Sequence, residues 1–420
     1  MATLRVEPLA RPIDAVVAVP GSKSIANRAL VCAALAQGAS TFHNLPDGDD
    51  TEAMLACLDL LGVGIGQGKQ TTVLGTGGDL RPGPLELPTR LAGTTSRFVT
   101  ALAALGPGPY LIDGALPLRA RPMSPLHDAL VALGATLQPG EQWGHLPVTV
   151  SGPLRPLDRL EVRGDISSQF LTALMLIGPY VAGGLRIAIT TPLVSRPYVE
   201  ITRAVMAEFG HDSVTISDTS VEVGPGRYSA RDYTIEPDAS SASYPLAAAA
   251  IAGGRVEIPG LTKASMQGDA GFCEVLASMG CTSRRDASST VVESAEVLRG
   301  VDIDMVDLSD LVPTLAAVAT FAESSTRIRG VGFIRAKESD RLGDLCIELR
   351  RLGALATETG DGLIIEPAPL HGALLHTHHD HRLAMAFGLI GLRVPGVEID
   401  EPDVVSKSWP GYWGMLGGLR

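Results

Sequence analysis

Residues 21–40, GSKSIANRALVCAALAQGAS, contain the type of segment that decides the fold. A small polar cluster is followed by an Ala/Leu-rich helical run, a Gly break and a short strand. The same succession recurs at intervals of about 70 residues, longer than the units of solenoid repeats. Its six occurrences begin at Gly21, Gly93, Gly164, Pro237, Asp307 and Asp380. Because each interval has room for several strands and two helices, we predict an α/β fold of six repeated units, grouped in threes as two lobes.

The composition limits the classes of partner. The chain has 420 residues and a formal net charge of −12, so we expect neither nucleic acid nor an anionic membrane as a partner. Its five cysteines form no C-x-x-C pair, which indicates a reducing compartment rather than a disulfide framework. No apolar run approaches the roughly 18 residues of a membrane helix. We therefore expect a soluble, cytoplasmic protein.

Polar clusters stand at or near the starts of the recurring helical runs. Helix starts present unpaired N–H groups and partial positive charge, which suit anions. In PGSKSIANRAL, residues 20–30, Ser22 stands where a nucleotide-binding Walker loop requires Gly, so the sequence indicates an anion without identifying it. The candidate ligands in the first half are Lys23, Ser24, Arg28, Gly93, Arg119, Arg121, Ser167, Ser168, Gln169, Ser195, Arg196 and Tyr198.

The second half adds carboxylates to the cations. Its candidates are Asp310, Lys337, Glu338, Asp340, Arg341, His381, Arg382 and Lys407. We expect KESDRL, residues 337–342, to begin a helix with Ser339 as its cap, which would place Lys337 and Arg341 one helical turn apart. Any one of these residues alone is typical of a solvated surface charge or a helix cap. Their number in an acidic protein favours binding of anionic ligands.

The stretch HTHHDHR, residues 376–382, offers an alternative in a different class. His376, His378, Asp380 and His381 have the spacing of a binuclear metallo-hydrolase. Such sites also need ligands further along the chain, and the sequence has no His after His381. We therefore expect no metal, and we expect Asp380 and His381 to begin the sixth repeated helix.

Together, several motifs closely resemble those of the enolpyruvyl transferase family. They are PGSKSIANRAL, LAGTTSRF, RARPM, SSQ, VSRPY, KESDRL, DHR and SKSWP, in the order of that family and spread over nearly the whole chain. The resemblance implies two pseudo-threefold domains, each of three βαβαββ units. It places residues 21–235 in the first lobe and residues 1–20 and 236–420 in the second, discontinuous lobe.

The resemblance also assigns roles residue by residue. It implies that phosphoenolpyruvate donates an enolpyruvyl group to shikimate 3-phosphate, with no cofactor and in a monomer. Shikimate 3-phosphate is assigned to Lys23, Ser24, Arg28, Ser167, Ser168, Gln169, Ser195, Asp310 and Lys337. Phosphoenolpyruvate is assigned to Lys23, Gly93, Arg121, Gln169, Arg341, Arg382 and Lys407. Asp310, Glu338 and Lys23 are the implied catalytic residues, and the inhibitor glyphosate is expected to bind beside Gly93.

Some positions depart from the family pattern. Leu91 and Phe333 stand where Asn is frequent, and Phe98 stands where Pro is common, which raises the question of how the helix near Gly93 begins. A second alternative, transfer to UDP-N-acetylglucosamine, is usually accompanied by a cysteine before the RARP motif. Here the loop reads DGALPLRARP and has none.

Overall fold

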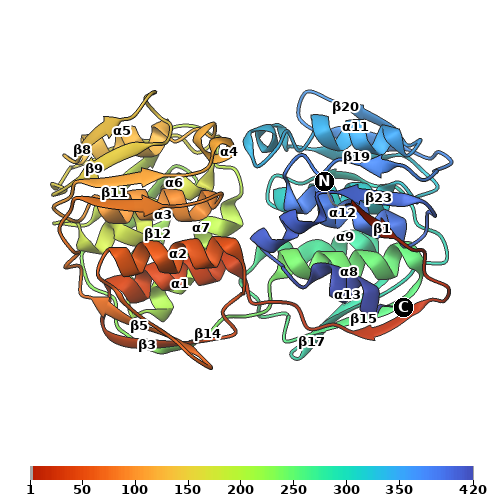
Figure 1. The fold of residues 1–420 in the computed structure, drawn as a ribbon, viewed down its shortest axis with the longest axis horizontal. Helices are drawn as coiled ribbons and strands as arrows, with labels where there is room; N and C mark the ends of the chain where they lie inside the picture. The colour runs from red at the N-terminus through yellow and green to blue at the C-terminus, as the bar shows by residue number, and fades with distance from the viewer. Residues whose placement is uncertain (1–2, 420) are drawn as a thin grey trace. The chain divides into compact units, whose positions relative to one another are not determined.

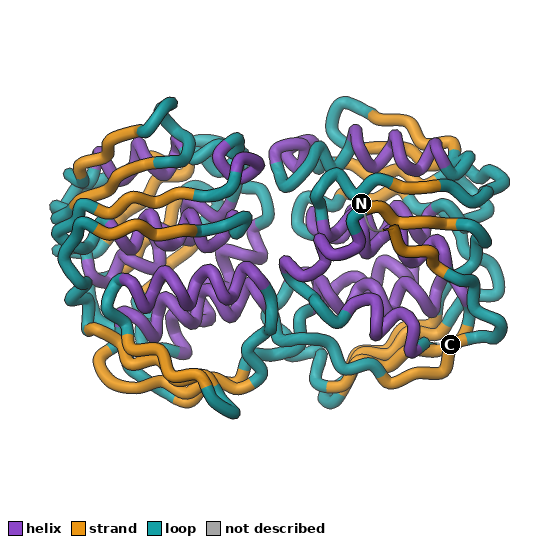
Figure 2. The backbone as a smooth tube through the Cα atoms, viewed as in Figure 1, coloured by secondary structure: helices purple, strands orange, loops and turns teal. Residues whose placement is uncertain are grey.

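The computed structural model describes residues 3–419, and its backbone divides into two compact units. The amino-terminal unit comprises residues 21–235, and the carboxy-terminal unit comprises residues 1–20 and 236–420. The chain therefore passes from one unit to the other twice. In each unit the helices lie towards the middle and the strands lie around them (Figure 2).

The amino-terminal unit contains three repeats, which can be followed in Figure 1. The first consists of α1 (Lys23–Leu35), β3 (Gln37–His43), α2 (Asp49–Leu60), β4 (Gly64–Gln67) and β5 (Thr71–Thr76), completed by β14 (Asp232–Thr234). The second consists of β6 (Leu85–Pro88), α3 (Gly93–Ala103), β7 (Tyr110–Asp113), α4 (Leu116–Arg119), α5 (Ser124–Ala132), β8 (Thr136–Pro139) and β9 (Val148–Ser151). The third consists of β10 (Leu160–Val162), α6 (Ser168–Ile177), η1 (Gly178–Tyr180), β11 (Leu185–Ile189), α7 (Arg196–Glu208), β12 (Val214–Ile216) and β13 (Ser220–Val223).

The carboxy-terminal unit repeats the plan. Its first repeat consists of β2 (Ile13–Val16), α8 (Ala239–Ala252), β15 (Gly254–Pro259), η2 (Gly268–Gly271), α9 (Phe272–Ser278), β16 (Thr282–Arg285) and β17 (Ser289–Glu293). The next consists of β18 (Asp302–Asp304), η3 (Ser309–Leu311), α10 (Val312–Ala319), β19 (Thr326–Arg329), η4 (Gly332–Ala336), α11 (Gly343–Arg351), β20 (Leu355–Glu358) and β21 (Leu363–Glu366). The last consists of β22 (Leu374–Leu375), α12 (His381–Gly391), β23 (Val397–Asp400), η5 (Pro402–Lys407) and α13 (Tyr412–Gly418).

The sheets share one pairing pattern. In the order β6-β7-β9-β8, the pair β6 and β7 is parallel, and β9 is antiparallel to both β7 and β8. Its register places Leu87 opposite Ile112 and Ile112 opposite Val148, and all three side chains are fully buried. A parallel pair joined through a helix, followed by an antiparallel strand, is the expected result of a βαβαββ succession.

The sixth repeat differs from the other five. Among residues 3–419, five sheets have four strands and the sixth has three, in the order β1-β23-β22. Its antiparallel strand is β1 (Thr3–Val6), from the start of the chain, where the other repeats use a strand that follows their second helix. The prediction of six α/β repeats is therefore confirmed, and the last is completed by the amino terminus.

The central helices form the core of each unit. Helices α1, α3 and α6 contact one another, as do α8, α10 and α12. Their Ala, Leu and Ile side chains are almost all buried. A helix that is apolar on all sides is stable only inside a protein, so these six helices are fixed in place from every direction.

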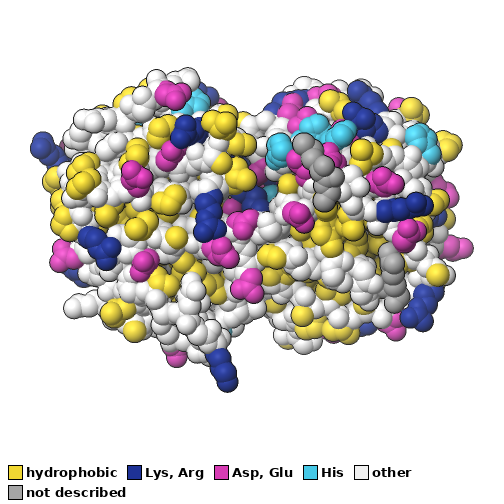
Figure 3. Space-filling view, in the orientation of Figure 1, with side chains coloured by type: hydrophobic (Ala, Val, Ile, Leu, Met, Phe, Trp, Pro, Cys, Tyr) yellow, Lys and Arg dark blue, Asp and Glu magenta, His cyan; other side chains and the backbone are white. Residues whose placement is uncertain are grey.

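The surface carries mixed charge. Acidic and basic side chains are interspersed over the face drawn in Figure 3. No helix within residues 3–419 has the length and apolar character needed to cross a lipid bilayer.

Candidate active site

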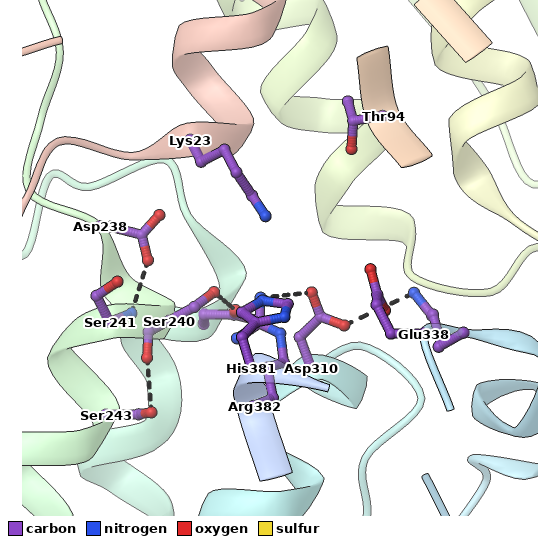
Figure 4. Close-up of polar contacts among 12 residues, drawn as sticks. Lys23, Thr94, Asp238, Ser240, Ser241, Ser243, Asp310, Glu338, His381 and Arg382 are labelled. Carbon is purple, nitrogen blue, oxygen red and sulfur yellow. Dashed lines mark hydrogen bonds and ion pairs between the residues drawn. The ribbon is translucent and has the colours of Figure 1, made fainter. Parts of the chain in front are cut away.

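Side-chain caps mark the starts of three central helices. Ser167 accepts the Gln169 N–H of α6 at 3.2 Å, and Asp238 accepts the Ser241 N–H of α8 (Figure 4) at 2.6 Å. Asp380 accepts the Arg382 N–H of α12 at 2.8 Å, so the prediction that the sixth repeated helix begins at Asp380 and His381 is confirmed.

A compact group of charges surrounds Asp310, which lies in η3 just before α10. The Asp310 carboxylate is 2.8 Å from Nη2 of Arg382 and 3.0 Å from Nη1 of Arg341. Nζ of Lys337 lies 3.6 Å from the same carboxylate. The pair of Asp310 and Arg382 is drawn in Figure 4, with Glu338 beside it. Three cations from two motifs, Lys337 and Arg341 of KESDRL and Arg382 of DHR, therefore meet one carboxylate.

Arg341 is the most enclosed cation of this group, with 1% of its side chain exposed. Nε donates to Asp380 Oδ2 at 2.6 Å, and Nη2 donates to Glu338 Oε2 at 2.7 Å. Together with Asp310, these carboxylates allow the guanidinium to remain charged without water. The sequence treated Asp380 only as a helix start, and the structure adds this second role.

These contacts control the ionisation of the group. Burial alone would raise the pKa of Asp310, but Arg382, Lys337 and Arg341 outweigh it and hold the pKa well below its ordinary value. Burial alone would lower the pKa of Arg341, yet Asp380, Glu338 and Asp310 raise it. Asp310 and Arg341 are therefore both ionised at neutral pH.

The backbone of KESDRL differs from the prediction. Residues 337–342 form bends and a turn rather than a helix, and α11 begins at Gly343. Asp340 Oδ1 accepts the N–H groups of Leu342 and Gly343 at 3.1 and 3.0 Å, so Asp340 holds the helix entry in place of Ser339. Lys337 and Arg341 consequently reach Asp310 from a loop, not from one helix face. Leu345 and Leu349 of α11 and the flanking Leu342 and Leu352 are fully buried.

Lys337 and Lys407 occupy partly enclosed positions. Nζ of Lys337 lies 6.0 Å from the ring centroid of Phe333, within cation–π range. The Phe at position 333, where Asn is frequent in the family, therefore places an aromatic ring beside a candidate substrate-binding residue. Lys407 ends η5 and is 6% exposed.

In the amino-terminal unit, Lys23 is the first residue of α1. Its Nζ lies 2.8 Å from Asp50 Oδ2, and the two side chains are 17% and 4% exposed. Asp50 stands at the start of α2 and was not a candidate from the sequence. Nothing in the sequence around Asp50 distinguished it from its acidic neighbours in the first turn of α2.

Arg28 is buried among neutral groups. Nη1 donates to the Ser24 carbonyl at 2.7 Å, Nη2 to the Tyr198 carbonyl at 3.1 Å and Nε to Thr202 Oγ1 at 2.9 Å. Its Cζ lies 5.5 Å from the ring centroid of Phe98. Burial lowers the pKa of Arg28 to about 10, which still leaves the guanidinium charged at neutral pH.

Gly93 is the first residue of α3, and Phe98 lies within the same helix. A Cβ at Gly93 would lie 2.4 Å from Nη1 of Arg121 and 3.1 Å from Nη1 of Arg97. The absence of a side chain at Gly93 therefore lets the Arg121 guanidinium pack against the backbone of this helix start. The sequence had suggested only the approach of a ligand.

The remaining candidates of this unit lie at the starts of α6 and α7. Gln169 Nε2 donates to Thr94 Oγ1 at 3.3 Å, whereas Gln169 Oε1 is buried without a partner within residues 3–419. Ser168 opens α6, Ser24 is the second residue of α1, and Ser195 precedes α7 in a left-handed conformation with φ of 54°. A non-glycine residue in that region indicates a constrained position.

The histidines of HTHHDH contact separate carboxylates. His376 pairs with Asp400, His379 pairs with Glu401, and His378 pairs with Glu348 on α11. Within residues 3–419, His, Cys, Asp and Glu side chains form no group of three arranged to hold a metal ion.

Asp269 is a further carboxylate close enough to Asp310 to be affected by its charge, and the sequence did not indicate it as a candidate. Asp269, in η2, is 5% exposed and accepts the Ser240 hydroxyl. Burial, with the negative charge of Asp310, raises the pKa of Asp269 to about 6. The surrounding sequence, MQGDAGF, contains no pattern that indicates a functional site.

Comparison with known proteins identifies the class of fold. The chain superposes on an enolpyruvyl transferase of Streptomyces tendae with a TM-score of 0.78 and 20% identity, covering 99% of this chain and 97% of that one. It superposes on the EPSP synthase of Acinetobacter baumannii with a TM-score of 0.82 and 25% identity, covering 99% and 98%. The two-domain α/β architecture is therefore that of the enolpyruvyl transferases.

The sequence identifies the family within that class. The pattern of the EPSP synthase (3-phosphoshikimate 1-carboxyvinyltransferase) family matches residues 9–416. Relatives named 3-phosphoshikimate 1-carboxyvinyltransferase include one from a Nostoc species, 45% identical over 98% of both chains. Another, from Methanoculleus marisnigri, is 40% identical over 97% of both. The chain belongs to the EPSP synthase family, and neither the UDP-N-acetylglucosamine alternative nor the metallo-hydrolase alternative is favoured.

Proposed function

We propose that the protein transfers the enolpyruvyl group of phosphoenolpyruvate to the 5-hydroxyl of shikimate 3-phosphate and releases phosphate. The observation that carries the proposal is the cluster in which Lys337, Arg341 and Arg382 converge on Asp310. Membership of the EPSP synthase family supports the choice of substrates.

The charge of the substrates accounts for the number of cations. The two substrates together carry roughly five negative charges, and unit charges 4 Å apart repel by ~4 kcal/mol at an effective dielectric near 20. We assign their neutralisation to Lys23, Arg28, Arg121, Lys337, Arg341, Arg382 and Lys407. Fixed cations in an enclosed site can also stabilise the charge that develops during the reaction.

The reaction needs one acid and one base that exchange roles. The substrate hydroxyl gives its proton to a base as its oxygen bonds to C2 of phosphoenolpyruvate, and C3 gains a proton from an acid, which gives a tetrahedral intermediate. The bond between C2 and the phosphate oxygen then breaks as C3 loses a proton. We assign these proton transfers to Asp310 and Glu338, assisted by Lys23.

The contacts of Asp310 suggest how substrate binding prepares it. With Arg382, Lys337 and Arg341 beside it, the pKa of Asp310 is too low for efficient proton abstraction. Substrate anions that engage the same cations would weaken their hold on the carboxylate. The pKa of Asp310 would then rise towards the working range when both substrates are bound.

The neutral donors complete the assignment. We assign shikimate 3-phosphate to Ser24, Ser167, Ser168, Gln169 and Ser195 as well as to Lys23, Arg28, Asp310 and Lys337. We assign phosphoenolpyruvate to Gly93 and Gln169 as well as to Lys23, Arg121, Arg341, Arg382 and Lys407. The unsatisfied Oε1 of Gln169 supports its role as a ligand-binding amide.

We further propose that the two units are the two lobes of a monomeric cytoplasmic enzyme without a nucleic-acid or membrane partner. The net charge of −12 supports the absence of a nucleic-acid partner. Because arginines and lysines supply the charge stabilisation, we expect turnover to be unchanged after dialysis against EDTA. Loss of activity that Zn²⁺ or Mg²⁺ restores would contradict a metal-free site.

Phosphate release from phosphoenolpyruvate tests the reaction. We expect release only when shikimate 3-phosphate is present, with enolpyruvylshikimate 3-phosphate as the organic product by mass spectrometry. UDP-N-acetylglucosamine in place of shikimate 3-phosphate should give no release. Equal release without any acceptor would overturn the assignment.

A further inference from the structure

The turn before α12 has an unfavourable backbone. His378 and His379 have φ of 51° and 57°, the left-handed region that residues other than glycine seldom occupy twice in succession. The Asp380 N–H closes the turn by donating to the Thr377 carbonyl at 2.8 Å. Since neither central residue is glycine or asparagine, contacts outside the turn must hold this conformation.

The main outside contact is a buried carboxylate on α11. Glu348 is fully buried, and its Oε2 accepts the His376 N–H at 3.0 Å. Its Oε1 lies 3.0 Å from His378 Nε2, and Asp344 lies 3.5 Å from Nδ1 of the same ring. A carboxylate excluded from water is costly unless it is paired. Glu348 is paired with the turn and with Arg351, whose Nε lies 3.2 Å from its Oε2.

The turn delivers Asp380 to the charge cluster. Asp380 is fully buried, and its Oδ2 lies 2.6 Å from Arg341 Nε. Its Oδ1 accepts the Arg382 N–H that starts α12. The conformation of residues 377–380 therefore determines where both arginines are held.

We propose that Glu348 is a positioning residue, which holds the 377–380 turn through His376 and His378 and so fixes Asp380, Arg341 and Arg382. His376 and His378, which have the spacing of metal ligands in the sequence, are thereby assigned a role in positioning the turn. The kinetic part of this proposal rests on the proposed function, in which Arg341 and Arg382 bind phosphoenolpyruvate.

Two carboxylates that contact the same turn provide a matched comparison. Glu348→Gln removes the buried anchor, whereas Glu401→Gln removes the partner of His379, which is 67% exposed. We expect Glu348→Gln to raise KM for phosphoenolpyruvate about tenfold and to change KM for shikimate 3-phosphate less than twofold. Glu401→Gln should leave both constants within twofold of the parent protein. Equal effects of the two substitutions would overturn the proposal.

A rescue variant separates positioning from general stability. His378→Asn with His379→Gly creates an Asn-Gly pair, which favours left-handed backbone at both positions. Added to Glu348→Gln, this pair should restore most of the lost affinity for phosphoenolpyruvate. An anchor needed only for stability would instead leave KM raised in the triple variant.

Hydrogen exchange of residues 376–384 provides a readout that does not depend on activity. Without substrates, Glu348→Gln should speed exchange of the Asp380 and Arg382 amides at least tenfold, and the Asn-Gly pair should reverse the change. Unchanged exchange in folded Glu348→Gln overturns positioning, whereas absent turnover in the parent protein overturns only the proposed reaction. If Glu348→Gln does not fold, His378→Ala is measured in the same way, with the same outcomes deciding.

Discussion

Arg28 in the amino-terminal unit and Arg341 in the carboxy-terminal unit are both buried, but they are surrounded by different groups. Arg28 contacts the Ser24 and Tyr198 carbonyls, the Thr202 hydroxyl and the Phe98 ring. Arg341 contacts the carboxylates of Asp310, Glu338 and Asp380. The pKa of Arg28 is lowered by burial, whereas that of Arg341 is raised by its neighbours.

The difference indicates two ways of using a buried cation. Neutral dipoles fix the position of Arg28 and leave its positive charge available to attract a distant anion. Carboxylates cancel the charge of Arg341, so an incoming anion must compete with them. We infer that the amino-terminal unit supplies attraction, and that the carboxy-terminal unit couples binding to the state of Asp310.

Of the substitutions that test this difference, we expect removal of the Asp310 carboxylate to have the largest effect on activity. Asp310→Asn removes the proposed proton-transfer group and leaves Arg382 and Lys337 with less compensation. We expect turnover to fall about 10² to 10⁴-fold, the usual contribution of such a group. Asp302→Asn, which only loses an exposed pair with Arg329, is the control and should retain activity. Near-normal turnover of Asp310→Asn in steady-state assays would remove it from the mechanism.

Replacing each arginine by methionine tests the contrast directly. Arg341→Met leaves buried Asp380 without its counter-charge, which should reduce the free energy of unfolding by about 3–5 kcal/mol. Arg28→Met leaves only neutral acceptors unsatisfied, so we expect a smaller loss of about 1–3 kcal/mol. Denaturant unfolding of the two variants at neutral pH measures both values. Equal losses would show that the identity of the counter-groups is unimportant for stability.

Asp269 gives the carboxy-terminal unit a pH dependence. Its pKa rises from the ordinary 3.8 to about 6 on folding, so its contribution favours the folded state below pH 4 and is lost as the pH rises through 6. We therefore expect Asp269→Asn to be more stable than the parent protein at pH 7.5, by about 1–3 kcal/mol. The gain should disappear at pH 4, as measured by denaturant unfolding at both values. A gain that is the same at both pH values would contradict the raised pKa.

The sequence predicted the repeated fold and part of the charge cluster around Asp310, but not all of that cluster. Recurrence of one segment type predicted six repeats, because buried helices must be apolar on all sides and such runs are visible in the chain. Motifs predicted Asp310, Arg341 and Arg382, but not the cluster partner Asp380 or the anchor Glu348. Those roles depend on contacts between residues 39 and 28 positions apart, for which a single sequence carries no spacing rule.

The predicted helix at KESDRL was wrong for a related reason. Its local pattern suits a helix start, but tertiary contacts decide otherwise, since Arg341 must face Asp380 and Asp310 at once. Asp340, which also pairs with Arg335, accepts the N–H groups of Leu342 and Gly343 at the entry to α11. Local propensity gave way to an ion-pair network, as is common where a site is built.

The smallest expected effect concerns Gly93, where the amino-terminal unit places arginines against backbone. In Gly93→Ala the new methyl group would meet the end of the Arg121 side chain, which is flexible and can shift. We expect a stability change below about 1 kcal/mol and a rise of a few-fold in KM for phosphoenolpyruvate. Glyphosate is longer than phosphoenolpyruvate and would need the space that the displaced guanidinium takes, so its inhibition constant should rise more than KM does. Steady-state kinetics with both compounds measures the two ratios. Equal ratios would mean that Arg121 moves without narrowing the space that glyphosate needs.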